Sequence, residues 1–114
     1  MYPVTLNLQG RRCLVVGGGV VAQRKVLGLL EEGAHVTVVA PHVVAELEER
    51  ASNDWLVLER REYRSGEAGG YALVIAATSE RAVNRQVFED GETAGVWVNV
   101  ADDPELCSFH LPAR

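Results

Sequence analysis

The chain has 114 residues, of which 47% are hydrophobic and 24% charged, and its formal net charge is −5. That length supports one domain with its own core, but not a cofactor domain joined to a full substrate domain. The acidic balance argues against a nucleic-acid partner, and no apolar run has membrane-spanning length or signal-peptide character, so we expect one folded cytoplasmic domain over residues 1–114, with no membrane partner.

The first half of the chain has the pattern of a strand, a glycine turn, a helix and a second strand. The apolar run over residues 12–17 ends in glycines and is typical of a parallel strand buried on both faces. From Val20 onward, apolar residues recur at helical spacing until Gly33 offers a left-handed stop. A β-branched run over residues 34–40 predicts the second strand, and residues 43–51 predict a short helix.

The second half continues the alternation. It predicts a third strand over 55–59, a glycine-rich loop over 65–70, a fourth strand over 72–77, a helix from about 80 to 88, a fifth strand over 96–100 and a candidate sixth strand over 106–111. Because strands alternate with helices, we predict a single-domain α/β fold of Rossmann type. Its doubly wound, mainly parallel sheet would carry helices on both faces.

A glycine-rich turn joins the first predicted strand to the first predicted helix. Gly17-Gly-Gly-Val-Val-Ala22 fits the G-x-G-x-x-G/A fingerprint of dinucleotide-binding domains. One glycine permits the tight turn, another lets a pyrophosphate approach the backbone, and Ala22 allows the helix to pack closely. The amino terminus of the helix offers free N–H groups and a positive dipole. The turn therefore predicts a dinucleotide site.

The position that usually recognises the adenosine ribose carries no acid here. The fingerprint normally has an acidic residue about twenty positions further on. In this chain the second strand ends in Val39-Ala-Pro-His42, and no arginine follows directly to bind a 2′-phosphate. Charge at this position therefore does not choose between NAD and NADP. His42 either contacts the cofactor or is a solvated loop residue, and the sequence leaves both open.

Polar residues follow the fourth and fifth strands, where the ligand crevice of a doubly wound sheet lies. Thr78 and Ser79 either hydrogen-bond the cofactor or cap the next helix. Asp102 and Asp103 stand side by side after Asn99. A carboxylate there is suited to take a proton from a substrate carbon while hydride leaves for nicotinamide, although adjacent aspartates before a proline are also common in turns.

The other reactive side chains form no recognised cluster. Basic pairs at 11–12, 24–25 and 60–61 could hold an anionic substrate, while solvated edges account for most of them. Cys13 and Cys107 lie far apart and are expected to be small buried apolar residues, without a disulfide or a zinc site. No metal site is predicted, because the histidines have no ligand grouping.

Four segments together resemble one known family. In chain order they are Leu-Val-Val-Gly-Gly-Gly-Val-Val-Ala-Gln-Arg-Lys (14–25), Gly-Ala-His-Val-Thr-Val-Val-Ala-Pro (33–41), Leu-Val-Ile-Ala-Ala-Thr (73–78) and Val-Asn-Val-Ala-Asp-Asp-Pro-Glu-Leu-Cys-Ser-Phe (98–109). They are similar to the precorrin-2 dehydrogenase family, the NAD-binding part of siroheme synthase. The resemblance runs from about Tyr2 to the end of the chain, and its last segment is far more specific than the glycine motif.

The resemblance implies an enzyme that oxidises precorrin-2 to sirohydrochlorin with NAD as hydride acceptor, joined in some members by ferrochelation to siroheme. The catalytic aspartate of the family falls on Asp102. The cofactor contacts of the family fall on Gly17, Gly18, Gly19, Val20, Val21, Pro41, His42, Ala77, Thr78 and Asn99.

The chain also departs from the family. Family members continue into a helical dimerisation segment and a small tail that help to enclose the tetrapyrrole, and this sequence lacks both. A homodimer is expected of the complete family protein, while dimerisation and independent activity of this chain stay open. The alternative from another class is a non-enzymatic NAD(H)-sensing domain, although such sensors usually keep the acid after the second strand.

Overall fold

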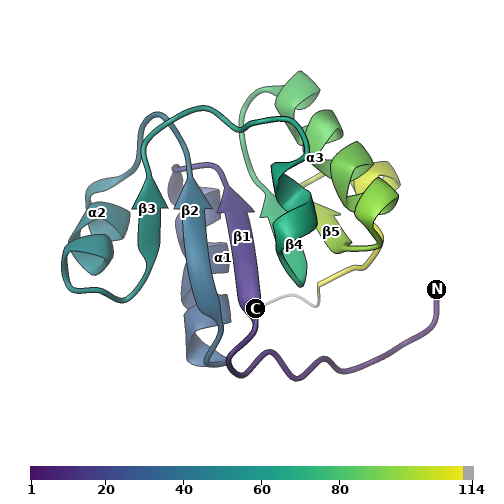
Figure 1. The fold of residues 1–114 in the computed structure, drawn as a ribbon, viewed down its shortest axis with the longest axis horizontal. Coiled ribbons are helices and arrows are strands. Elements are labelled where there is room, and N and C mark those ends of the chain that lie inside the picture. Colours follow the sequence, from purple (N-terminus) through teal and green to yellow (C-terminus); the bar gives the residue numbers. More distant parts are fainter. Residues whose placement is uncertain (112–114) are drawn as a thin grey trace.

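The computed structural model describes residues 1–111 and contains a five-stranded parallel sheet (Figure 1). The strands are β1 (Arg12–Val16), β2 (His35–Val39), β3 (Val57–Glu59), β4 (Leu73–Ala76) and β5 (Trp97–Val100). The helices are α1 (Val20–Glu31), α2 (Ala45–Ser52) and α3 (Arg81–Ala94), and two 3₁₀ turns are η1 (Glu67–Gly70) and η2 (Pro104–Leu106). The expected domain over 1–114 thus extends three residues beyond the described part.

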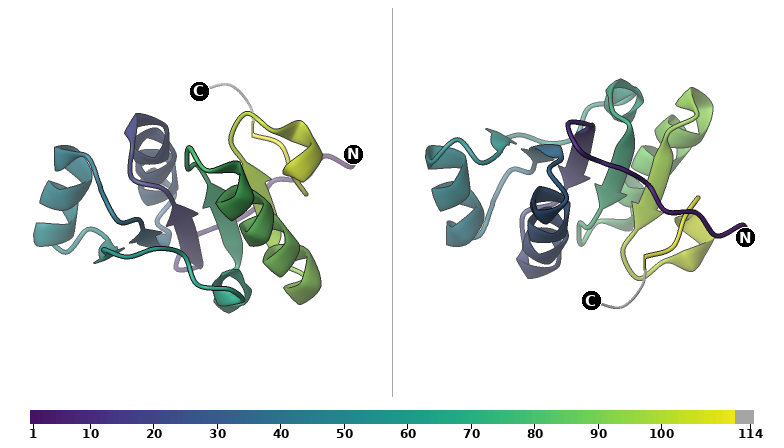
Figure 2. Two further views of the ribbon diagram at one scale, coloured as in Figure 1. Left: turned by 90° about the horizontal axis from the view of Figure 1, so that it is seen from above. Right: turned by 90° about the horizontal axis from the view of Figure 1, so that it is seen from below.

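The sheet is doubly wound about its first strand. The strand order is β3-β2-β1-β4-β5, and all four strand pairs are parallel. Helices α1 and α2 cover one face of the sheet, whereas α3 and η1 cover the other (Figure 2). The long connection from β3 to β4 carries the chain from one side of β1 to the other. The predicted α/β architecture, with helices on both faces, is confirmed.

The central strands bury both of their faces, which explains their continuous apolar runs. In β1, the side chains of Cys13 and Val15 join the hydrophobic cluster beneath α1 and α2, while Leu14 and Val16 join the cluster beneath α3. None of the four is more than 2% exposed. Because successive residues of a strand point to opposite faces, the first strand serves both halves of the core.

Helix α3 is longer than predicted, since it continues beyond residue 88 to Ala94. The polar residues around Gly91 interrupt the apolar pattern, but this glycine lets α3 approach the sheet closely. A Cβ atom at Gly91 would lie 2.1 Å from Cγ2 of Val98. Gly95 then ends the helix in the left-handed conformation, with φ of 73°.

Among the described residues, no helix is both long and apolar enough to cross a lipid bilayer.

The predicted sixth strand over 106–111 is wrong. After β5 the chain turns through η2 and returns along the outer edge of β5, where side chains replace most of a backbone ladder. The Val98 N–H donates to Oγ of Ser108 at 2.7 Å, and the Val100 N–H donates to Sγ of Cys107 at 3.2 Å. A single backbone bond joins the segments, from Ser108 N–H to the Val98 carbonyl. The β5 edge is therefore covered without a further strand.

Candidate functional site

Two adjacent cavities open at the carboxyl ends of the strands. The larger, of about 580 Å³, is lined by the glycine turn, the residues that follow β2 and β4, and part of the β3–β4 connection. It lies where the chain leaves β1 and β4 in opposite directions, and we call it the switch-point cavity. The smaller, of about 310 Å³, lies beside α1 after β5, and we call it the β5 cavity. Val21 lines both.

The three glycines of the turn have different structural roles. Gly17 has φ of 136°, and a Cβ atom there would lie 2.4 Å from the Ala77 carbonyl oxygen. A Cβ atom at Gly18 would lie 2.0 Å from the His42 carbonyl oxygen. These two glycines therefore let the turn pack against the chain after β4 and after β2. A Cβ atom at Gly19 would have nothing within 4 Å, so this glycine leaves space open at the start of α1.

The beginning of α1 suits an anionic group. Gly19 is the N-cap residue and supplies no side-chain cap, and the first turn of the helix contains no acidic residue. The first N–H groups of a helix have no acceptor within it, and its dipole is positive at this end. Val20 and Val21 line the switch-point cavity here. The open space beside Gly19 and these free donors fit the pyrophosphate of a dinucleotide.

The chain after β2 forms another wall of the switch-point cavity. Pro41 and His42 both line it, and both side chains are exposed. The backbone of this segment is tied to the glycine turn, since the Val44 N–H donates to the Gly18 carbonyl at 2.8 Å. The two proposed roles of His42, as a cofactor contact or a solvated residue, are thus both compatible with its place on an open wall.

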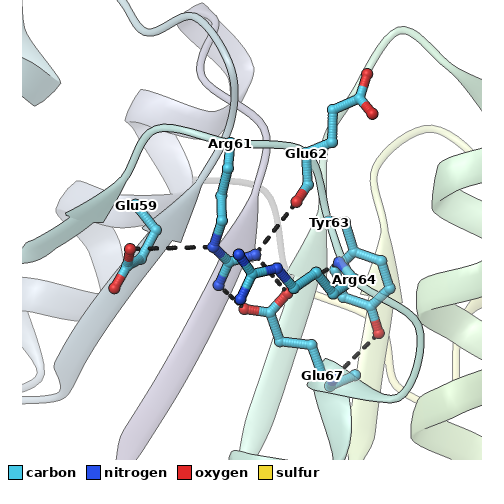
Figure 3. A network of polar contacts seen from close by, with 7 residues as sticks. Glu59, Arg61, Glu62, Tyr63, Arg64 and Glu67 are labelled. Carbon is cyan, nitrogen blue, oxygen red and sulfur yellow. Dashed lines mark hydrogen bonds and ion pairs between the residues drawn. The ribbon is translucent and has the colours of Figure 1, made fainter.

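A third wall comes from the β3–β4 connection, which sequence reasoning missed. Glu62 and Tyr63 line the cavity there. Figure 3 shows the cluster that holds this connection: the Arg61 guanidinium donates to both carboxylate oxygens of Glu67 and also lies near Glu59. The hydrogen bonds from Arg61 lower the pKa of Glu67. The predicted doubly wound topology could have indicated this wall, because a connection that leaves β3 for β4 must cross the ends of β2 and β1.

The residues after β4 are held by a side chain of α3. Ala77, Thr78 and Ser79 line the switch-point cavity. The Asn84 side chain accepts the Thr78 N–H at 3.2 Å and donates to the Thr78 carbonyl at 3.0 Å. Neither Thr78 nor Ser79 is the N-cap of α3, because Glu80 occupies that position without a side-chain cap. The N-cap role expected of Thr78 or Ser79 is therefore not seen, although the Thr78 hydroxyl accepts the Glu80 N–H at 3.2 Å just before the helix. Asn84 holds this wall in place.

The β5 cavity contains the two aspartates. Asp103 lies 3.5 Å from the Arg81 guanidinium, whereas the Asp102 carboxylate has no hydrogen-bond or ion-pair partner within residues 1–111. Asp102 also has φ of 62°, which aspartate tolerates better than most residues. Asn99 lies in this cavity and not in the switch-point cavity, with its amide donating to the Phe109 carbonyl at 3.0 Å. Of the predicted cofactor contacts, Asn99 thus lines the β5 cavity together with Val21, and the others line the switch-point cavity.

Two cations line the β5 cavity together with the aspartates. Arg24 and Lys25, on the second turn of α1, both line it, and neither makes an ion pair with any residue from 1 to 111. Such unpaired cations at a cavity wall suit the binding of carboxylates. Metal ligands are not gathered in the described part of the chain, where no three His, Cys, Asp or Glu side chains form a suitable group.

Burial raises the pKa of both cysteines in this fold. Cys13 is fully buried, as predicted, and burial raises its pKa to about 11. Cys107 is only half-buried and lines the β5 cavity, so the expectation of an apolar buried residue holds less well for it. Its pKa is also raised by burial. Because a thiolate is the nucleophilic form, neither cysteine is activated for covalent chemistry.

Comparisons with known proteins agree with this geometry. A family model described as "Putative NAD(P)-binding" matches residues 4–113. The chain is 43% identical over 111 residues to a siroheme synthase of Nitrosococcus oceani and 45% identical over 111 residues to that of Ectopseudomonas mendocina. Each match covers 97% of this chain and 24% of the relative.

A solved structure is similar as well. The chain superimposes on SirC, a precorrin-2 dehydrogenase, with a TM-score of 0.84 and 36% sequence identity. The match covers 99% of this chain and 55% of the solved one. The chain therefore spans about a quarter of the two siroheme synthases and about half of the dehydrogenase.

Proposed function

The chain belongs to the NAD(P)-binding family whose model spans residues 4–113, and on that premise we propose that it is the dinucleotide-binding part of an NAD-dependent precorrin-2 dehydrogenase. The reaction is the oxidation of precorrin-2 to sirohydrochlorin in siroheme biosynthesis. One observation carries the proposal: a cavity suited to a dinucleotide adjoins a cavity with an unpaired carboxylate, and Val21 lines both. The names of the siroheme synthases and of SirC support the choice of substrate.

The switch-point cavity binds the dinucleotide in this proposal. Gly17 and Gly18 bring the walls after β4 and β2 against the turn, and Gly19 leaves room for the pyrophosphate beside the first N–H groups of α1. The remaining contacts are those of Val20, Val21, Pro41, His42, Ala77 and Thr78, which all line the cavity. Asn99 supports the adjoining cavity and holds the returning chain at Phe109.

The β5 cavity binds the reacting part of the tetrapyrrole. Bound NAD supplies the hydride acceptor. In the oxidation, two hydrogens leave adjacent atoms of the substrate. One leaves as a hydride, which would go to NAD, and the other leaves as a proton. Asp102 accepts the proton, because its carboxylate is exposed to the cavity and engaged with no other described residue, whereas that of Asp103 is paired with Arg81. Arg24 and Lys25 bind carboxylates of the substrate and so orient it over Asp102.

The experiment compares Asp102→Asn with the wild type in the full-length protein, under anaerobic conditions with precorrin-2 and NAD. Asparagine tolerates the positive φ at this position, so the backbone turn persists. Because general-base catalysis contributes typically 10²–10⁴-fold, we expect kcat to fall by about a hundredfold or more, with the Kd for NAD unchanged.

Asp103→Asn is the matched control, since it changes the neighbouring carboxylate in the same way. We expect it to retain kcat within about threefold, because its exposed partner Arg81 contributes little. Equal turnover by wild type and Asp102→Asn would remove Asp102 from its proposed role. Binding of NAD without any turnover of precorrin-2 by the wild type would overturn the dehydrogenase proposal and favour a sensing domain.

A further inference from the structure

The switch-point cavity is acidic along its wall. Among its lining residues the carboxylates are those of Glu62 and Glu80, and no Lys or Arg from residues 1–111 lines it. NADP differs from NAD by a phosphate on the adenosine ribose, and such a group carries about −1.5 to −2 charges at neutral pH. The residues that line the cavity offer this phosphate no cation, and the charged groups among them are carboxylates. The charge of the wall thus bears on which dinucleotide binds.

Glu62 lies beside the chain that follows β2. Glu59 pairs with Val39 in the parallel register of β3 and β2, and the Ala40 N–H donates to the Glu59 carbonyl at 3.2 Å. Glu62 and His42 each lie three residues beyond this Glu59–Val39 pair, and both line the same cavity. In dinucleotide-binding sheets the end of the second strand borders the adenosine ribose, and an acid there accepts hydrogen bonds from its hydroxyls.

The backbone at Glu62 is held on both sides. The Arg61 guanidinium donates to the Glu62 carbonyl at 3.2 Å and also binds the Glu67 carboxylate. On the other side, the Tyr63 hydroxyl donates to Asp90 of α3 at 2.6 Å. The backbone position of Glu62 is thus fixed before a ligand binds, so only its side chain has to be ordered on binding.

The Glu62 side chain itself is free. Its carboxylate points away from the Arg61–Glu67 cluster in Figure 3, and it makes no hydrogen bond or ion pair with residues 1–111. The two preceding arginines do not neutralise it, because Arg60 pairs with Glu48 and Arg61 pairs with Glu67. Glu62 is therefore an unpaired acceptor that lines the same cavity as Pro41 and His42, the segment in which the expected acid after β2 is missing.

We propose that Glu62 selects NAD over NADP. Its carboxylate accepts hydrogen bonds from the hydroxyls of the adenosine ribose and repels a 2′-phosphate, in place of an acid at the end of β2. The inference rests on the proposed function for the dinucleotide site and adds the residue that discriminates between the two dinucleotides. Glu80, at the start of α3, belongs to the wall after β4 and serves as the comparison within the same cavity.

The test measures Kd for NAD and for NADP separately by calorimetry, in the full-length protein. We expect the wild type to prefer NAD, and Glu62→Gln to weaken NAD binding by about tenfold, as the loss of a hydrogen bond to a charged group does. Glu62→Arg should lower the ratio of the NADP Kd to the NAD Kd by about tenfold or more, because it supplies a cation for the 2′-phosphate.

Two matched variants separate this role from a general charge effect. Glu89 is exposed on α3 and lines neither cavity, so Glu89→Arg should leave both Kd values unchanged. Glu80→Arg changes the other carboxylate of the cavity and should alter the ratio by less than about threefold, because an exposed charge away from the 2′ position is screened by salt. Unfolding midpoints of the variants, which we expect to match the wild type, show that the fold is retained.

The outcomes distinguish the two proposals. If the wild type binds NAD but the ratio of Kd values is the same in Glu62→Arg, the inference about Glu62 is wrong while the proposed function stands. A larger change in Glu80→Arg than in Glu62→Arg, or a preference of the wild type for NADP, would also overturn it. If the wild type binds neither dinucleotide, the proposed function itself fails together with the inference.

Discussion

Gly18 and Gly19 are neighbours with opposite surroundings, so alanine at each should have a different effect. A Cβ atom at Gly18 would overlap the backbone of His42, whereas one at Gly19 would meet no atom within 4 Å. We expect Gly18→Ala to lower the free energy of unfolding by about 1–3 kcal/mol through overpacking. Gly19→Ala should cost no more than about 1 kcal/mol, because alanine is a poorer N-cap residue than glycine but its methyl group meets no other atom.

Ligand binding separates the two glycines further. In Gly19→Ala the added methyl group stands where the pyrophosphate approaches the backbone, so we expect the Kd for NAD to rise by about tenfold or more with the fold intact. Thermal unfolding and NAD titration of both variants check the pair of expectations. A large loss of stability in Gly19→Ala, or normal NAD binding by it, would show that its open surroundings are not part of the ligand site.

Site residues were predictable from the sequence where their role depends on near neighbours. The glycine turn follows from a strand, a helix and the spacing between them, and the role of Asp102, which stays a prediction, was implied by the family resemblance of the segment around it. Glu62 was not found, because its place in the cavity depends on where the β3–β4 connection crosses the sheet. The assignment of Asn99 to the dinucleotide stays a prediction, but the sequence did not indicate that Asn99 lines the β5 cavity and donates to the Phe109 carbonyl. Such tertiary contacts leave no mark on local sequence patterns.

Elements were predicted best where burial gives a continuous pattern. The four-residue core of β4 is buried at every position, so its apolar run was sufficient. The last turns of α3 were missed because polar residues and Gly91 break the helical spacing, although Gly91 is the point at which the helix packs on Val98. The chain over 106–111 looked like a strand, but its side chains, and not its backbone, take most of the bonds to β5.

The covered edge of β5 leads to a prediction about Ser108. Its hydroxyl accepts the N–H of Val98, a fully buried residue, at 2.7 Å. Ser108→Ala leaves that N–H without its acceptor, and a buried unsatisfied donor costs about 1–3 kcal/mol. We expect the free energy of unfolding to fall by that amount in urea denaturation. Ser108→Thr keeps the hydroxyl and should recover most of the loss.

Ser65→Ala is the control for this experiment, because Ser65 is exposed and lies in the β3–β4 connection. Its stability should match that of the wild type. If Ser108→Ala were as stable as Ser65→Ala, the hydroxyl would contribute nothing to the β5 edge. The returning segment would then be held by its backbone bond and by the bonds of Cys107 and Asn99.

At the scale of the whole molecule, the switch-point cavity joins the two halves of the sheet. Its walls come from the glycine turn and the chain after β2 on one side and from the chain after β4 on the other. A bound dinucleotide therefore resists separation of β4 from β1. At a NAD concentration of about 100 times Kd, the stabilisation is about 2.7 kcal/mol, which slows amide exchange through that opening by about a hundredfold.

Hydrogen exchange with and without NAD checks this expectation. The amides of β1 and β4 should be protected strongly, while those of β3, at the far edge of the sheet, should gain less because they exchange by local opening. The strands thus serve as controls for one another. Equal protection of β3 and β4 would indicate that the ligand does not act at the junction of the two halves.

The position of β1 at the centre of the sheet has a consequence for biosynthesis. A ribosome releases β1, β2 and β3 before β4, the strand that covers the second edge of β1, has been made. During that interval the nascent chain exposes an apolar strand edge of the kind that promotes aggregation and recruits chaperones. The dinucleotide site needs the chain after β4. The cofactor can therefore bind only after β4 has been made and has covered the exposed edge of β1.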